Sequence, residues 1–236
     1  MKCVFIDETS DSKFKSYHGL SIASVDSRFY PNLKEQFQSK LISVGWDPSI
    51  EFKGSYIFSK KSGDTNVDVP ERVELAREVI ALNKSKSNSR MKFHYSSCES
   101  DDSKKAYLSQ IEKNLPKAIG KPSKGTGKNL LSLHFDQRSD VTIKELRDLS
   151  LPILSQKGWK LYEDISIASS GFQTIGILFA DIVGYMQARI ETISSDAELF
   201  DGLDLFNYQR NGKIRKLNTS TEIIDGIKTI EVKKIG

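Results

Sequence analysis

Residues 2–7, which read Lys-Cys-Val-Phe-Ile-Asp, open the sequence as an apolar run that ends in a carboxylate. A short apolar run of this kind, bounded by polar residues, is typical of a β-strand. A polar stretch at 8–16 and a second strand-like stretch at 19–26 follow. The two strands are therefore expected to pair as a wide hairpin.

Beyond this hairpin, segments with helical spacing alternate with strand-like segments. Helices are predicted over 31–45, 70–82, 103–115, 142–156 and 174–193, strands over 91–95, 130–136 and 159–167, and an extended stretch over 50–58. This alternation predicts an α/β fold, a mixed sheet flanked by helices. One domain with helical insertions is expected over 1–196. Residues 197–236 are expected to form an extension that packs on this domain and ends in a β-hairpin at Asp225-Gly226.

The composition limits the classes of protein to consider. The 236 residues are 38% hydrophobic and carry 35 Lys and Arg against 31 Asp and Glu. The resulting charge of +4 permits a nucleic-acid partner without requiring one. The cysteines and histidines stand apart, and no window reaches 18 uninterrupted apolar residues. These features predict a soluble, cytoplasmic protein with no membrane segment, in which any metal is a hard cation bound by carboxylates.

Two acids end strand-like runs. Asp7 follows the run 3–6, and Asp136 follows the run 130–135. A carboxylate at the end of such a strand lies at the sheet edge where the active sites of α/β proteins gather. Taken singly, each Asp is also compatible with a simple cap of the turn that follows it.

A third acid, Asp181, lies in the helical segment 177–185, which is apolar on almost every side. An ionised carboxylate buried there costs several kcal/mol unless a positive group pairs with it. That group would be a Lys or Arg side chain or a divalent cation. The small residues Gly176, Ala180 and Gly184 would let this helix approach the sheet closely.

Glu51 and Lys53 complete the candidate site. In an extended segment their side chains point to the same side, so that they offer an acid to a metal and an ammonium to a phosphate oxygen; an ordinary solvent-facing pair is the alternative. Four acids that meet at one sheet edge would make an oxygen site suited to Mg²⁺ or Mn²⁺. Two such ions, about 3.5–4 Å apart, can activate a water and stabilise the leaving oxygen in phosphodiester hydrolysis. The acids therefore point to nuclease chemistry.

Four short stretches carry a family resemblance: Val4–Asp11 (VFIDETSD), Glu51–Ser55 (EFKGS), Leu133–Gln137 (LHFDQ) and Gly176–Val183 (GILFADIV). In order and content they resemble the motifs of a bacterial and phage family of unknown function that opens with FIDESGD, the domain of unknown function 3800 type. The resemblance implies a ribonuclease H-like fold, with Asp7, Glu51, Asp136 and Asp181 as the metal-binding acids. The sequence departs from the family at Leu178, where Gln is usual, and at Thr9-Ser10, where Ser-Gly is common.

The leading hypothesis is a metal-dependent nuclease. In it Asp7, Glu51, Asp136 and Asp181 hold Mg²⁺ or Mn²⁺, and Lys53 steadies the scissile phosphate. The backbone of an RNA or DNA substrate would be tracked by the basic residues Lys117, Lys121, Lys124 and Lys128 of the 117–129 region, with Arg138 as a further phosphate contact.

Two other classes of protein compete with this hypothesis. One is a catalytically weak nucleic-acid-binding or protein-interaction module on the same fold, in bacterial defence or a mobile element. The other is an α/β phosphatase, which ranks last because Thr9 stands where an aspartyl-phosphate enzyme carries its second Asp. Apolar residues of the terminal hairpin leave a homodimer or a protein partner open.

Overall fold

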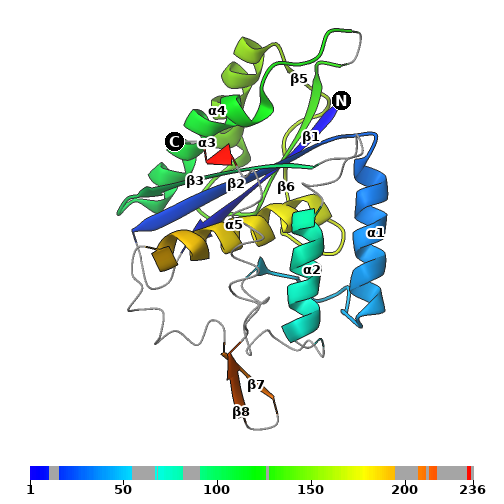
Figure 1. Cartoon of the computed structure of the whole chain (residues 1–236). Helices are drawn as coiled ribbons and strands as arrows, with labels where there is room; N and C mark the ends of the chain where they lie inside the picture. The colour runs from blue at the N-terminus through cyan, green and yellow to red at the C-terminus, as the bar shows by residue number, and fades with distance from the viewer. Residues whose placement is uncertain are drawn as a thin grey trace.

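A central sheet with helices on both faces organises the chain (Figure 1). The structure, a computed structural model, describes residues 1–10, 16–54, 67, 69–81, 91–125, 128–194, 207–210, 213–216 and 233–234. The predicted hairpin around Asp225-Gly226 and the second half of the predicted 50–58 extended stretch lie outside these residues.

The strand order and directions identify the fold. β1 (Lys2–Ser10) pairs antiparallel with β2 (Tyr17–Asp26), and β2 pairs antiparallel with β3 (Lys92–Glu99). On its other side β1 pairs parallel with β4 (Leu130–Phe135), which pairs parallel with β5 (Lys160–Leu161) and β6 (Ser166–Ile167). The strands follow the order β5-β4-β1-β2-β3 across the sheet. β1, β2 and β3 are antiparallel neighbours, whereas β4 and β5 run parallel to β1. This arrangement is that of a ribonuclease H-like sheet. The predicted fold class is confirmed.

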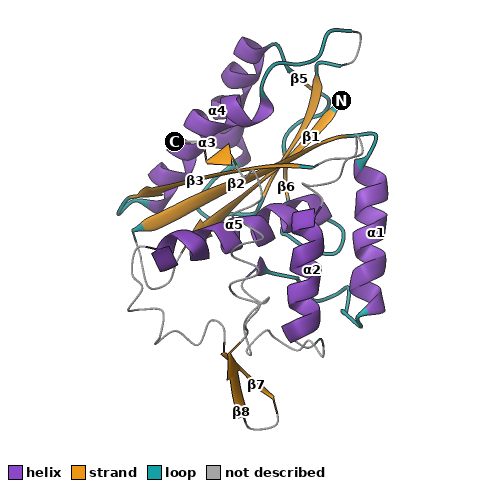
Figure 2. Ribbon diagram, viewed as in Figure 1, coloured by secondary structure: helices purple, strands orange, loops and turns teal. Residues whose placement is uncertain are grey.

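Helices cover the two faces of the sheet unequally (Figure 2). On one face lie α3 (Ser103–Ile119) and α4 (Ile143–Lys157). On the other lies α5 (Ile175–Ser194), with α1 (Tyr30–Ser43) and α2 (Val69–Ala81) packed outside it. The alternation of side chains along β1 divides the core, because Cys3 and Phe5 belong to the α5 side while Val4 and Ile6 belong to the α3 and α4 side.

Local signals explain most helix bounds. Thr142 caps α4 through a capping box with Glu145. Asp102 accepts a hydrogen bond from the backbone N–H of Lys105 at the start of α3. α3 extends to Ile119 rather than ending at 115 as predicted. The buried apolar spacing continues through Ala118 and Ile119, and Gly120 follows the last residue of the helix with φ of 61°.

The prediction of a single strand over 159–167 is wrong. It breaks into β5 and β6, with a bend between them. In that bend Asp164 accepts a hydrogen bond from its neighbour, the Ile165 N–H, and forms an ion pair with Arg147 of α4. A carboxylate that accepts a hydrogen bond from the adjacent backbone N–H competes with the hydrogen bonds between strands, and this competition accounts for the break between β5 and β6.

The last described strands lie in the C-terminal part of the chain. β7 (Asn207–Arg210) and β8 (Lys213–Lys216) pair as an antiparallel two-stranded sheet. β9 (Lys233–Lys234) adds to the edge of the main sheet, parallel to β3. The domain boundary at 196 and the packing of the whole extension remain predictions.

Candidate functional site

Asp7 and Asp136 meet at the centre of the site because β1 and β4 are parallel neighbours. The Asp136 N–H donates to the Ile6 carbonyl at 2.8 Å and extends the pairing past the end of β4. The two carboxyl groups share a hydrogen bond in which Asp7 is the donor. Burial, followed by the charges of Asp181 and Asp136, raises the pKa of Asp7 well above its usual range. The two carboxyl groups therefore repel each other when both are ionised, and a proton or a cation between them relieves that repulsion.

Asp181 reaches the same place from α5. Its Oδ2 accepts a hydrogen bond of 2.6 Å from the Gly54 N–H. Burial raises the pKa of Asp181 to about 7; the Gly54 hydrogen bond opposes this shift, while the charge of Asp136 adds to it. Of the positive groups expected beside this acid, the structure provides the ammonium of Lys53, whose charge lowers the pKa of Asp181, while a divalent cation there remains a prediction.

Glycines set the distance between α5 and its neighbours. A Cβ on Gly54 would lie 2.6 Å from the Tyr185 Cβ and 3.0 Å from the Asp181 carbonyl oxygen. A Cβ on Gly184 would lie 2.7 Å from the Thr9 Oγ1, and one on Gly176 would collide with the Phe5 ring. The prediction that small residues of this helix permit close approach to the sheet is confirmed for both helix glycines.

Glu51 and Lys53 lie beside the three aspartates. The Lys53 Nζ is 3.2 Å from the Glu51 Oε2, and the Lys53 side chain remains 47% exposed. The charge of Lys53 acts on Asp7, Asp136 and Asp181, and the charge of Glu51 acts on Asp136 and Asp181. The structure therefore brings all five predicted catalytic residues together.

Ser170 is a site residue that the sequence reasoning missed. It lies between β6 and α5, where its N–H donates to the Asp136 Oδ1 at 3.1 Å and its Oγ donates to the Glu51 Oε1 at 2.9 Å. One buried serine thus joins two acids from different parts of the chain. The signal in the sequence is the Ser169-Ser170-Gly171 turn that precedes α5.

The donor set fits a hard divalent cation. The acids supply carboxylate oxygens, which such ions prefer, and a cation would offset the burial and the mutual repulsion that raise the pKa values of Asp7, Asp136 and Asp181. Within the described part of the chain, no three Asp, Glu, His or Cys side chains already stand as a group of metal ligands.

Arg138 is held apart from these acids. Its guanidinium forms ion pairs with Glu8 and with Asp140, the latter at 2.8 Å, and lies 4.8 Å from the centre of the Tyr107 ring. Its side chain is only 9% exposed. The phosphate contact expected of Arg138 remains a prediction, and it would require these ion pairs to open.

The predicted basic residues lie far from the acids. Lys117 is near the C-terminal end of α3, and Lys121, Lys124 and Lys128 lie in the connection that leads into the start of β4. Asp136 follows the other end of β4. Six residues of strand separate the two ends by about 20 Å. A nucleic acid that contacts both groups must therefore run along the sheet.

Leu178, which stands where the related family has Gln, is a core residue here. It is fully buried in the apolar cluster that α5 forms with α1, α2 and the sheet. By the family resemblance, the Gln usual at this position would place a polar amide beside the site. The structure instead gives this position an apolar packing role, one turn before Asp181 on α5.

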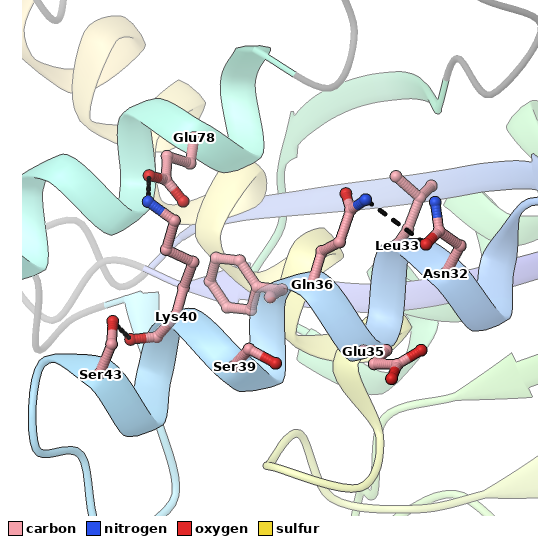
Figure 3. A pocket seen from close by; sticks show the side chains of 9 residues that line it. Asn32, Leu33, Glu35, Gln36, Ser39, Lys40, Ser43 and Glu78 are labelled. Atoms are coloured by element: carbon pink, nitrogen blue, oxygen red, sulfur yellow. Dashed lines mark hydrogen bonds and ion pairs between the residues drawn. The ribbon is translucent and has the colours of Figure 1, made fainter.

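A hollow of about 730 Å³ lies elsewhere on the molecule, over the outer side of α1 (Figure 3). Its lining includes Asn32, Gln36, Lys40 and Glu78, and an ion pair of 2.7 Å between Lys40 and Glu78 ties α1 to α2 there. The residues that line this hollow include none of the predicted site residues.

No family model and no curated protein matches the sequence. Among solved structures, the ribonuclease H2 from Pyrococcus horikoshii OT3 is similar at 11% identity and a TM-score of 0.41, over 97% of this chain and 100% of that chain. A likeness of this degree transfers no activity and no residue role. None of the described helices is long and apolar enough to cross a membrane.

Proposed function

We propose that this protein is a metal-dependent nuclease that hydrolyses phosphodiester bonds in RNA or DNA. The observation that carries the proposal is the meeting of four carboxyl groups from separate parts of the chain, Asp7, Glu51, Asp136 and Asp181. A fold gains no stability from repelling buried acids, so a set of this kind suggests a function that needs them.

These carboxylates would hold Mg²⁺ or Mn²⁺, which supplies an activated water and stabilises the leaving oxygen in phosphodiester hydrolysis. The residues of the chain keep the acids in place. Ser170 orients Asp136 and Glu51 through its two donors, and the Gly54 N–H fixes one oxygen of Asp181. Supporting hydrogen bonds of this kind set the direction in which a carboxylate presents its free oxygens.

Lys53 is suited to bind the substrate phosphate. Its ammonium is half exposed while it remains paired with Glu51, so one side chain faces both the acids and the solvent. An ammonium in that position can donate to a non-bridging phosphate oxygen and stabilise the charge that develops on it.

The test is a cleavage assay with matched variants. Labelled single- and double-stranded RNA and DNA are incubated with the protein in Mg²⁺, in Mn²⁺ and in EDTA. Asp7→Asn and Asp181→Asn each remove one charge while keeping the shape of the side chain. Asp148→Asn is the control, because Asp148 is exposed on α4, on the opposite face of the sheet.

We expect cleavage by the wild type and by Asp148→Asn in metal only, with both site variants inactive. Mn²⁺ should also raise the melting temperature of the two active proteins and not of the site variants. If nucleic acid is bound but never cut, and Mn²⁺ stabilises nothing, the nuclease proposal is wrong and the binding module takes its place.

A further inference from the structure

The face of β4 that leads away from the acids is only partly covered. The helix α5 packs across β1, β2 and β3 (Figure 1). Along β4 the side chains on the α3 and α4 face, Leu131, Leu133 and Phe135, are fully buried. Those on the other face, Leu130, Ser132 and His134, are only half-buried. One face of this central strand is thus less completely covered than the other, and that face, which we call the open face of β4, ends at Asp136.

Three polar side chains form a chain of hydrogen bonds on this open face. The ring of His134 is bonded to the Ser132 Oγ at 2.6 Å and to the Ser166 Oγ at 2.5 Å. The ring also stacks on Phe5, with 4.9 Å between the centres. A neutral imidazole donates through one nitrogen and accepts through the other. The hydroxyl that accepts from the ring therefore keeps its own O–H free for another acceptor.

Cations continue this face at the end opposite Asp136. Lys160 pairs in register with Leu130, and its neighbour Leu161 packs on the α3 and α4 side, so the exposed Lys160 lies on the open face. The exposed Lys128 precedes β4 by two residues. Along the open face of β4, the ammonium of Lys160 lies at one end, the hydroxyls of Ser132 and Ser166 lie in the middle, and the acids lie at the other end. We call Ser132, His134, Ser166 and Lys160 the β4 shelf.

We propose that the β4 shelf binds the nucleic-acid backbone on one side of the scissile phosphate, with Lys160 and the one serine hydroxyl whose O–H the His134 ring leaves free donating to phosphate oxygens. This inference rests on the proposed function. Hydroxyl and ammonium donors are the groups that fix the register of a nucleic acid without reading its sequence. The shelf is about 20 Å long, the axial length of about six base pairs. The shelf also lies between the acids and the distant basic residues, so that one nucleic acid can contact both groups.

The test is the affinity for a fluorescently labelled oligonucleotide, measured by anisotropy in Ca²⁺ over a series of salt concentrations, with intact probe verified by gel. One variant is Ser132→Ala/Ser166→Ala, and its control is Ser155→Ala on the exposed side of α4. The other is Lys160→Ala, and its control is Lys144→Ala, which removes the same charge from exposed α4. Because Lys160 is exposed, the comparison of Lys160→Ala with Lys144→Ala still tests the proposal if the serine variant folds poorly.

We expect the double serine variant to bind about tenfold more weakly than the wild type. Lys160→Ala should lower the slope of log affinity against log salt by about 0.7–0.9, the value for one lost phosphate contact. Both controls should match the wild type. Wild-type affinity and slope in both shelf variants, with cleavage intact, would refute the shelf alone. If the wild type itself neither binds nor cleaves nucleic acid, the proposed function fails and the shelf fails with it.

Discussion

Gly54→Ala should disrupt the site without removing any of its functional groups. The new Cβ would lie 2.6 Å from the Tyr185 Cβ, 3.0 Å from the Asp181 carbonyl oxygen and 3.1 Å from its Oδ1. Two of these neighbours are backbone or Cβ atoms, which cannot rotate away. The segment that carries Gly54 must therefore move off α5, and the 2.6 Å hydrogen bond from its N–H to Asp181 must lengthen or break.

The expected cost combines two effects. Overpacking of a tight contact costs about 1–3 kcal/mol, and loss of a hydrogen bond to a charged acceptor costs about 1.5–3 kcal/mol. The lower backbone entropy of alanine in the unfolded chain returns about 0.4–1 kcal/mol. We therefore expect the free energy of unfolding to fall by about 2–5 kcal/mol. For a chain of this size the melting temperature would fall by about 3 °C per kcal/mol.

The assay is urea unfolding of the metal-free protein, with Mn²⁺ affinity measured by calorimetry. Gly171→Ala is the matched control, because it lies in the turn beside Ser170 and its Cβ would meet only the Thr174 Oγ1, at 3.9 Å. It should lose little stability and keep its Mn²⁺ affinity. Equal stability and equal Mn²⁺ affinity in Gly54→Ala and the wild type would refute the reasoning that this close contact positions Asp181.

Three further outcomes follow from the same geometry. The folded-state pKa values of Asp7, Asp136 and Asp181 are all raised, that of Asp181 to about 7, so the stability these groups contribute is present in full below about pH 4 and falls as the pH rises, for Asp181 through about 7; metal-free denaturation curves should show this decline, and a curve that rises over that range would contradict it. Ser170→Ala should weaken Mn²⁺ binding by roughly 10–100-fold in calorimetry, whereas its neighbour Ser169→Ala, whose hydroxyl bonds Gln137, should leave it unchanged. Arg138→Ala removes ion pairs and ring contact from a nearly buried side chain and should lower the unfolding free energy by about 2 kcal/mol; in the same denaturation assay Arg28→Ala, from an exposed pair with Asp26, should resemble the wild type.

Local pattern was sufficient for much of the fold. The apolar run that ends at Asp7 and the one that ends at Asp136 both became strands of the sheet, and Pro31, Thr142 and Gly158 lie near helix ends. These features depend on periodicity and capping, which act over a few residues and can be recognised in a sequence. The break in the predicted strand near Asp164 was missed, although the bond from the Ile165 N–H to the Asp164 carboxylate lies between neighbouring residues.

The sequence by itself determined that Asp136 follows a strand, that Asp181 occupies an apolar helix, and that glycines allow this helix to approach the sheet. The prediction that the first strand ends at Asp7 is wrong, because pairing with β2 continues β1 as far as Ser10. Only the tertiary structure decided how those acids are held. The Gly54 bond to Asp181 joins residues 127 positions apart, and the Ser170 bond to Glu51 joins residues 119 apart. It also decided that Arg138 faces Glu8 and Asp140 rather than solvent. The reason is physical: a hydrogen bond of about 3 Å depends on where two distant segments pack, and no short-range pattern in the chain records that position.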